Sequence, residues 1–538
     1  MMINKKFVSF IKHNYKNFKF LNYNSKNKIL FEFNNWSSLH IASSYLLKCL
    51  QEKYKADIYA YSAQPLVSRP LHMNLFDRLK WFFGKIFSLK FFGIYNSMGV
   101  KDFLYPHIDK KIKYKSKIIL KKLLKKIKHN KDVENINIYG IEIGDLIYDS
   151  YLRYYWRETI DIKEQSFVKY LEQSINIFLY WKKYFDSNKI NAVVLSHTVY
   201  LYGLFARIAT KKKIKVYVCQ PDYINSLKNN IPYARYEFIN AKKILKKIPK
   251  KLLNAGITHA KKRINYHLEG KKIDIWWTKN PFELKSKNRV LNKNNKFKFL
   301  IASNSFIDSP HAYGKNLFPD NYLWLDFIGK STINSDHEYY LKIHPYGDVL
   351  HEKRFTLDVM KNYIKKYPHI KLLPMNVGHK QLINEGIDCV LTVFGSVGFE
   401  YALFGIPVIN ASNKSATVNF DFNIHLKSIA KFKLLLLNPK RIKININKNE
   451  ILKYYFIRHI YYPRNWLFDN IQKIEQLYGG YSLEVYDYWV KKEFKKERHI
   501  KILKNLKKFI NSNNYILDYK FMDRDIINDM KNFNHNIY

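Results

Sequence analysis

The chain has 538 residues, of which 47% are hydrophobic and 25% are charged, a composition typical of globular domains that excludes a mainly disordered chain. Three widely separated cysteines exclude a disulfide-stapled scaffold and a cysteine-built metal site, and the length leaves room for two or three domains. The formal net charge of +49 indicates attraction to an anionic partner. Most of the surplus is lysine, however, so A/T-rich codon usage is an alternative explanation that the sequence leaves open.

Strand-like and helix-like stretches alternate in the first half of the chain. We predict strands at residues 29–33, 57–61, 136–139, 192–195 and 214–219, and helices at 38–50, 162–185 and 203–210. A strand–helix–strand order of this kind predicts a parallel, doubly wound sheet.

Residues 79–100 are rich in aromatic side chains and are the nearest approach to a membrane span. Three lysines interrupt them, which makes the segment too charged for a transmembrane helix. Trp81, Phe82, Phe87 and Phe92 favour a segment that lies in the lipid headgroup region. A core helix with lysines at its edges explains the same pattern. The first 28 residues are basic and lack the apolar core of a signal peptide.

The second half repeats the alternation after a polar region at residues 270–296. Predicted strands are 297–302, 339–343, 370–373, 389–393 and 408–410, and predicted helices are 322–328, 355–366, 379–385 and 397–404. We therefore expect an α/β fold with two doubly wound domains, at residues 1–285 and 286–440. Residues 441–538 are expected to form a basic helical tail that packs back on the domains.

The most specific motif is the stretch 392–409, TVFGSVGFEYALFGIPVI. It combines a buried strand, a turn of small residues, a short helix and a second strand. Gly395, Ser396 and Gly398 allow backbone amides to approach a ligand closely, and the following helix start favours an anion. Glu400 falls one turn inside that helix, where it can accept hydrogen bonds from ribose hydroxyls. A plain strand–turn–helix with Ser396 as the N-cap is the alternative.

The second motif is formed by Lys342, His344 and Pro345, which stand at the end of another predicted strand. Proline stops the strand, so the histidine is presented at the carboxyl end of the sheet, where open α/β domains bind ligands. Lone histidines are more often structural, but its place in the same predicted domain as the glycine-rich turn favours a binding role.

Together these motifs resemble the capsule and surface polysaccharide biosynthesis glycosyltransferases, which have the GT-B fold of two Rossmann-type domains facing a cleft. The His-Pro element is also similar to that of bacterial sialyltransferases and Kdo transferases, where it holds the phosphate of a CMP-sugar donor. The resemblance implies that His344 contacts donor phosphate, that Gly395 and Ser396 contact phosphate or nucleotide, and that Glu400 contacts ribose. Thr392 stands where many sugar transferases have the first of two glutamates, which weakens the case for a UDP- or GDP-hexose donor.

The resemblance extends over roughly residues 140–410, including segments 138–149 and 195–207. Glycosyl transfer needs a base for the acceptor hydroxyl, and the candidates are Asp145, Asp149, His197 and Asp308. The two aspartates at 145 and 149 lie one helical turn apart, but each can equally be structural. Lys342 and Arg207 are candidates to neutralise phosphate. Neither an Asp-x-Asp metal motif nor a histidine and cysteine cluster at ligand spacing is evident, so we expect a metal-independent enzyme without a cofactor.

We therefore expect a glycosyltransferase that moves a sugar from a nucleotide sugar, with CMP-linked donors included, to a glycan or lipid-linked acceptor of a surface polysaccharide. A nucleotide-sugar epimerase or a polyol-phosphate transferase on the same fold is the alternative. A nucleic-acid-binding protein is disfavoured, because only the charge supports it. We expect a cytoplasmic protein bound peripherally to the inner face of the membrane through anionic lipids.

Overall fold

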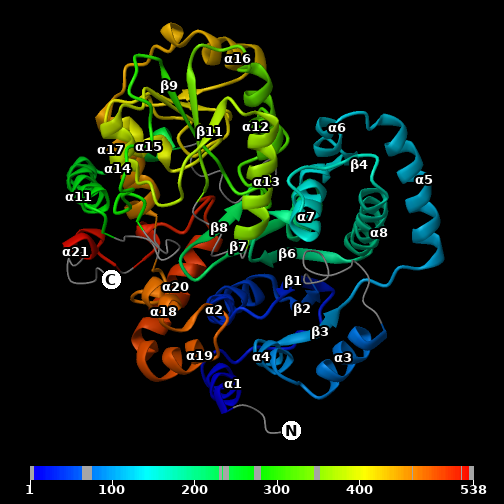
Figure 1. The fold of residues 1–538 in the computed structure, drawn as a ribbon. Helices are drawn as coiled ribbons and strands as arrows, with labels where there is room; N and C mark the ends of the chain where they lie inside the picture. Colours follow the sequence, from blue (N-terminus) through cyan, green and yellow to red (C-terminus); the bar gives the residue numbers. More distant parts are fainter. Residues whose placement is uncertain are drawn as a thin grey trace. The chain divides into compact units, whose positions relative to one another are not determined.

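The computed structural model describes residues 5–62, 75–228, 233, 241–271, 280–344, 352–462, 465–522 and 524–531. The chain divides into two compact units, which are described separately (Figure 1). Unit 1 comprises Met1–Tyr154, Asp161–Ala234 and Tyr462–Arg524, and unit 2 comprises Tyr155–Ile160, Arg235–Tyr461 and Asp525–Tyr538.

Unit 1 contains a six-stranded sheet of order β3-β2-β1-β6-β7-β8. Its strands are β1 (Asn27–Phe33), β2 (Asp57–Ser62), β3 (Val100–Leu104), β6 (Lys189–Leu195), β7 (Lys215–Cys219) and β8 (Ile224–Leu227). All neighbours are parallel except β7 and β8. From β1 the chain winds first toward β3 and then, from β6, toward β8, so the order reverses between β1 and β6. A separate hairpin pairs β4 (Asn137–Ile138) with β5 (Ile141–Glu142).

The helices of unit 1 come from both ends of the chain. They are α1 (Lys5–Asn17), α2 (Ser37–Tyr54), α3 (Leu75–Ile86), α4 (Phe91–Ser97), α5 (Lys110–Lys126), α6 (Asn130–Glu134), α7 (Gly144–Tyr155), α8 (Gln165–Ser187), α9 (Leu204–Lys211), α18 (Ile471–Tyr478), α19 (Glu484–Tyr488) and α20 (Lys496–Ile510). α19 packs on α1 and α20 packs on α2 (Figure 1). Trp466 and Trp489 are buried in the same core as the strands, so the end of the chain completes this unit.

Unit 2 contains a second six-stranded sheet, of order β11-β10-β9-β12-β13-β14. Its strands are β9 (Lys298–Ala302), β10 (Glu338–Lys342), β11 (Ile370–Leu372), β12 (Cys389–Thr392), β13 (Val408–Asn410) and β14 (Ile424–His425). Every neighbouring pair is parallel, and the winding reverses between β9 and β12. Its helices are α10 (Ala241–Leu245), α11 (Lys250–Leu268), α12 (Asn321–Ser331), α13 (Lys353–Lys366), α14 (His379–Glu385), α15 (Val397–Leu403), α16 (Ile429–Leu437), α17 (Lys448–Phe456) and α21 (Ile526–Lys531).

The two sheets confirm the predicted α/β class with two Rossmann-type, doubly wound domains. Most predicted strands of the second half match within one residue, because each is a short apolar run that is buried on both faces.

The boundaries between the units differ from the expected 285 and 440. Unit 2 already begins near residue 235, because α11 packs on α17 and His267 of α11 contacts Glu400. The expected tail is not one body either. Its first part, with α17, belongs to unit 2, residues 462–524 belong to unit 1, and α21 belongs to unit 2. Apolar side chains at positions 466–521 decide this division, since they fill the unit 1 core.

The aromatic segment at residues 79–100 has two faces. Trp81, Phe91 and Phe92 pack against the core, and a Cβ on Gly84 would lie 2.4 Å from the Phe92 ring, so the glycine permits close docking of α3. Phe82 and Phe87 are 54% and 63% exposed. The interpretation as a core segment therefore holds for one face, and the other face is exposed.

Within the described ranges, no helix is long and apolar enough to cross a membrane.

Candidate functional site

In unit 2, polar residues gather at the carboxyl ends of three adjacent strands, beside the point where the winding reverses. Ser303 and Asn304 follow β9, His344 follows β10 and Gly395 follows β12. Parallel strands end at the same edge of the sheet, and open α/β sheets bind ligands where the strand order reverses. The sequence-predicted His344 and Gly395 therefore share one edge of unit 2.

Hydrogen bonds fix the end of β10 to the end of β9. The Ser303 amide and hydroxyl both donate to the Lys342 carbonyl oxygen at 3.1 Å, and the Ser303 hydroxyl accepts from the His344 amide at 3.0 Å. Burial lowers the pKa of His344 to about 4, although the Asp308 carboxylate opposes the shift. The imidazole is therefore neutral at pH 7 and can exchange hydrogen bonds with a ligand without carrying a fixed charge. Pro345 lies outside the described residues.

Asn304 is a site residue that the motif search missed. It is only 7% exposed, and within the described part of the chain its Nδ2 has no hydrogen-bond partner. A Cβ built on Gly395 would lie 3.8 Å from its Oδ1, so the amide sits beside the glycine-rich turn. A buried donor without a partner costs about 1–3 kcal/mol, which a hydrogen-bonding ligand would recover. The sequence offered one signal for Asn304: it lies just after the predicted strand 297–302, and the strand order of the sheet reverses beside that strand.

The glycines of the turn have different roles. A side chain at Gly395 would meet Thr392 Oγ1 at 3.0 Å on the side of Asn304, whereas one at Gly398 would meet the side-chain amide of Asn423 at 2.6 Å. Gly398 is therefore required by packing within unit 2. Ser396 is exposed at the start of α15, which has only seven residues.

Two other predicted donor residues point into the protein. Lys342 is buried and donates from Nζ to the Val377 carbonyl oxygen at 2.7 Å, and burial lowers its pKa to about 8. The Glu400 carboxylate is buried, with Oε1 lying 3.5 Å from Nε2 of His267. Burial acts to raise the pKa of Glu400, but hydrogen bonding and charge from His267 outweigh it, and the net shift is downward. Both side chains are therefore engaged with other groups in the interior of unit 2.

Asp308 lies in unit 2, near His344. Its backbone amide donates to Ser305 Oγ at 3.1 Å, and its Oδ1 accepts from the Ser309 hydroxyl at 3.2 Å. Asp308 acts on His344 electrostatically, through the upward effect of its carboxylate on the pKa of the imidazole.

Unit 1 has a hydrogen-bonded cluster at its own reversal point, which we call the Glu32 cluster: Glu32, Ser196 and His197. Glu32 lies on β1, and the other two follow β6. The Ser196 amide and hydroxyl donate to the Glu32 carboxylate at 2.9 and 2.7 Å, and the same hydroxyl lies 2.8 Å from His197 Nδ1. The hydroxyl has one hydrogen, and it is directed to the carboxylate. The tautomer of His197 that completes this arrangement has its proton on Nδ1, which leaves Nε2 as the basic nitrogen.

Glu32 was not among the sequence candidates, because an acidic residue within an apolar strand carries no motif. Burial raises its pKa, opposed by the hydrogen bonds from Ser196 and Asn34. Predicted His197 is thus joined through Ser196 to a buried carboxyl group that orients it.

Aromatic rings surround the Glu32 cluster. The Trp36 ring stacks on His197 at 5.8 Å and on Tyr481 at 5.4 Å, and Tyr202 lies 6.3 Å from the histidine ring. Tyr481 is 62% exposed. The site therefore combines a basic nitrogen with an aromatic surface of the kind on which a sugar ring can pack.

Asp145 has a different environment from the one expected for a base. Its Oδ2 accepts from Arg207 Nη2 at 2.5 Å and from the Tyr233 hydroxyl at 2.9 Å, and its side chain is 0% exposed. Asp149, one turn along α7, is also buried. Since Arg207 already pairs with this carboxylate, we assign Asp145 and Arg207 to the packing of α7 on α9.

Within the described residues, no group of three or more histidine, cysteine, aspartate or glutamate side chains could hold a metal ion. Sequence reasoning missed one Asp-x-Asp spacing, at Asp523, Arg524 and Asp525. Asp523 lies outside the described residues, and Asp525 Oδ1 accepts from the Ile527 amide at 2.9 Å as α21 begins.

No protein-family model matches the chain, and no curated protein matches it. Solved structures that resemble it include a UDP-GlcNAc 2-epimerase from Methanocaldococcus jannaschii, with 15% identity over 80% of this chain and 98% of that one and a TM-score of 0.23. The β-Kdo 2,4-transferase KpsC from Thermosulfurimonas dismutans shares 13% identity over 50% of this chain and 79% of its own, with a TM-score of 0.31. A glycosyltransferase from Rickettsia africae shares 12% identity over 87% and 99%, with a TM-score of 0.24. These values identify no family, so we argue function from the chain's own residues.

Proposed function

We propose that the protein is a glycosyltransferase that uses a nucleotide-sugar donor. The observation that carries this proposal is the edge of the unit 2 sheet, where the unpartnered amide of Asn304 lies beside the Gly395 turn and His344 follows the adjacent strand. Such an edge suits a phosphorylated nucleotide ligand. His344, Asn304 and the backbone at Gly395 and Ser396 would contact the donor. Lys342 and Glu400 would support this edge from below.

Unit 1 would bind the acceptor. In this proposal His197 Nε2 takes the proton of the acceptor hydroxyl, the acceptor oxygen bonds to the anomeric carbon, and the sugar–phosphate bond breaks to release the nucleotide. Glu32 and Ser196 orient the imidazole, and Trp36 and Tyr481 offer a surface for the acceptor sugar. Asp308 remains the alternative base.

The finer assignments rest on the motifs. The Lys-x-His-Pro and Gly-Ser-x-Gly-x-Glu motifs resemble those of surface polysaccharide glycosyltransferases, and they support a capsule or related glycan as product and a CMP-linked sugar among the donors. We also propose that the reaction needs no metal ion, as expected for this class of enzyme.

Association with an anionic membrane at the cytoplasmic face completes the proposal, because acceptors of this class are commonly lipid-linked. Membrane association is supported by the exposed face of α3 and of the turn after this helix. The apolar side chains exposed there are Phe76, Phe82, Phe83, Ile86 and Phe87. Arg78, Lys80 and Lys90 are exposed around these rings. A second copy of the chain is a poor partner for this face, because two chains of charge +49 repel each other.

The donor site is tested by nucleotide binding. We expect CMP or another nucleoside phosphate to bind the wild type in calorimetry, and Asn304→Ala and His344→Ala to weaken that binding about tenfold or more, as the loss of a buried hydrogen bond implies. Asn334→Ala is the matched control, since Asn334 is exposed in the same unit and precedes β10 instead of following a strand. Unchanged affinity in both site variants would refute the assignment.

Turnover distinguishes the transferase from an epimerase on the same fold. An epimerase converts a nucleotide sugar without an acceptor, whereas the proposed enzyme releases free nucleotide and needs an acceptor for transfer. Interconversion of a nucleotide sugar by the protein alone would replace the transferase proposal with the epimerase.

A further inference from the structure

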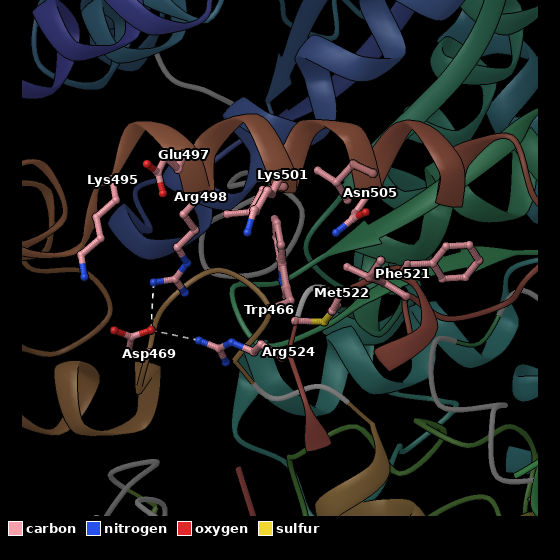
Figure 2. A pocket seen from close by; sticks show the side chains of 13 residues that line it. Trp466, Asp469, Lys495, Glu497, Arg498, Lys501, Asn505, Phe521, Met522 and Arg524 are labelled. Atoms are coloured by element: carbon pink, nitrogen blue, oxygen red, sulfur yellow. Dashed lines mark hydrogen bonds and ion pairs between the residues drawn. The ribbon is translucent and has the colours of Figure 1, made fainter. Parts of the chain in front are cut away.

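Unit 1 contains a cavity of about 300 Å³ outside the candidate site, shown in Figure 2. One wall is α20, and the other is formed by the segments around Trp466 and Phe521. This volume is at the lower end of the range for small-ligand sites. None of its lining residues belongs to the Glu32 cluster.

The cavity is cationic. Lys495, Arg498, Lys501 and Arg524 line it, against two acidic residues. One of the acidic residues, Asp469, is already occupied: its Oδ1 accepts from Arg498 Nη1 at 2.9 Å and from Arg524 Nη2 at 3.1 Å (Figure 2).

Further hydrogen bonds fix the two guanidinium groups in place. Arg524 Nη2 also donates to the Phe468 carbonyl oxygen at 2.8 Å, Arg498 Nη1 donates to Glu493 Oε2 at 3.1 Å, and Arg498 Nη2 donates to the Leu467 carbonyl oxygen. Arginine supplies 14 of the 93 basic residues of the chain, so lysine bias does not explain two arginines in one cavity. Planar guanidinium groups fixed in this way suit the recognition of phosphate or carboxylate.

Three further donors line the same space. Lys501 Nζ and the Asn505 amide extend from α20 toward Trp466 and Met522 (Figure 2), and Lys495 precedes α20. Among the residues that the structure describes, these three side chains make no hydrogen bond or ion pair. Apolar side chains come from both walls: Ile502 and Leu506 from α20, and Trp466 and Phe521 from the other wall, all largely buried around the space. Charged donors beside an apolar surface suit a small ligand with an anionic group attached to a ring.

We infer that this cavity is a binding site for an acidic sugar, a monosaccharide unit that carries a phosphate or a carboxylate. The cations hold the anionic group, Asn505 bonds a hydroxyl, and the apolar wall packs against the sugar ring. Binding there does not depend on the function proposed above, because no residue of the donor edge or of the Glu32 cluster takes part.

The cavity is also linked to the Glu32 cluster. Trp466 Nε1 donates to the Gln220 carbonyl oxygen at 2.8 Å, and the Gln220 side-chain amide donates to the Ser196 carbonyl oxygen at 2.7 Å. A ligand that touches Trp466 is therefore two hydrogen bonds from the strand end that carries His197.

Calorimetric titration of the full chain tests the inference, with glucose 6-phosphate and glucuronate as the two acidic probes. We expect at least one to bind with 1:1 stoichiometry and at least tenfold more tightly than glucose or inorganic phosphate. The double variant Lys495→Ala/Lys501→Ala should weaken this binding at least tenfold. Lys504→Ala/Lys508→Ala removes the same charge from exposed positions of α20 outside the cavity and should leave it unchanged.

Four results would overturn the inference. Three come from the titrations: no binding of either acidic probe, equal affinity for inorganic phosphate and glucose 6-phosphate, and equal losses in the two double variants. The second would mean that the cavity binds an anion without a sugar ring, and the third that binding follows general surface charge. Phosphatidylglycerol vesicles added as a competitor separate the two sources of a phosphate group, since displacement of glucose 6-phosphate by the vesicles would assign the cavity to a lipid headgroup and overturn the sugar assignment.

Discussion

Glu400 belongs to the most specific motif of the chain, but its carboxylate lies in the interior of unit 2 against His267. A motif gives the residue type and its spacing along a helix. It does not give the direction from which other elements cover that helix. Here the partner of Glu400 comes from α11, which is far away in the sequence. The buried contact with His267 of that helix therefore competes with the ribose contact that the motif implies.

Replacement of Glu400 tests which role dominates. We expect Glu400→Ala to lower the free energy of unfolding by about 3 kcal/mol, because removal of one partner of a buried pair leaves the other without compensation. Urea denaturation of wild type and variant measures this difference. Glu283→Ala, at an exposed position of the same unit, should have little effect. Unchanged stability together with lost nucleotide affinity would restore the ribose contact.

His197 gains its proposed role from a residue that the sequence did not indicate. We expect His197→Gln to lower kcat at least a hundredfold, the usual contribution of a general base, with donor affinity unchanged because the donor residues lie in unit 2. Ser196→Ala should lower kcat less and alter the pH profile of kcat, since Ser196 and Glu32 only orient the imidazole.

The matched control for this experiment is His107→Gln, at an exposed position of unit 1. Initial rates at saturating donor measure the effect. Full activity in His197→Gln, with activity abolished in Asp308→Asn, would transfer the role of base to unit 2.

At the scale of elements, α3 has one face in the core and one face exposed. Gly84 and Trp81 dock it on the core, Phe82 is exposed on the helix, and Phe87 is exposed in the turn that follows it. The composition of the segment could be read directly, but the split between inward and outward rings required the positions of Phe92 and β3.

Vesicle sedimentation tests the outward face. We expect the protein to sediment with vesicles that contain phosphatidylglycerol, to sediment less with pure phosphatidylcholine, and to be released by high salt, because screening weakens the lysine contacts. Phe82→Ser/Phe87→Ser should reduce binding at least tenfold, since each buried ring contributes about 1.5–3 kcal/mol. Tyr114→Ser, an exposed aromatic of α5, is the control. Equal binding by the double variant would remove α3 from the membrane proposal.

At the scale of the whole molecule, we ask whether the proposed reaction needs a metal ion. We expect activity to survive EDTA, because a neutral His344 and the donors at the unit 2 edge would stabilise the leaving phosphate without a cation. Initial rates with EDTA, and after addition of magnesium or manganese, measure this. Complete loss that either ion restores would contradict the prediction and direct attention to Asp523 and Asp525.

The sequence by itself indicated most strands of the two sheets, because short apolar runs separated by amphipathic helices are typical of the covered strands of an α/β fold. It did not indicate β3, β8 or β14, and the strand predicted at 136–139 lies in the separate β4–β5 hairpin. The sequence also located His344 and Gly395, since turns at strand ends are local features. Tertiary structure alone decided the partners: that Glu32 orients His197 through Ser196, that Asp145 pairs with Arg207, and that residues 462–524 complete unit 1. The physical reason is that burial and hydrogen bonding join residues hundreds of positions apart, and no local pattern of side chains records which distant surface will cover them.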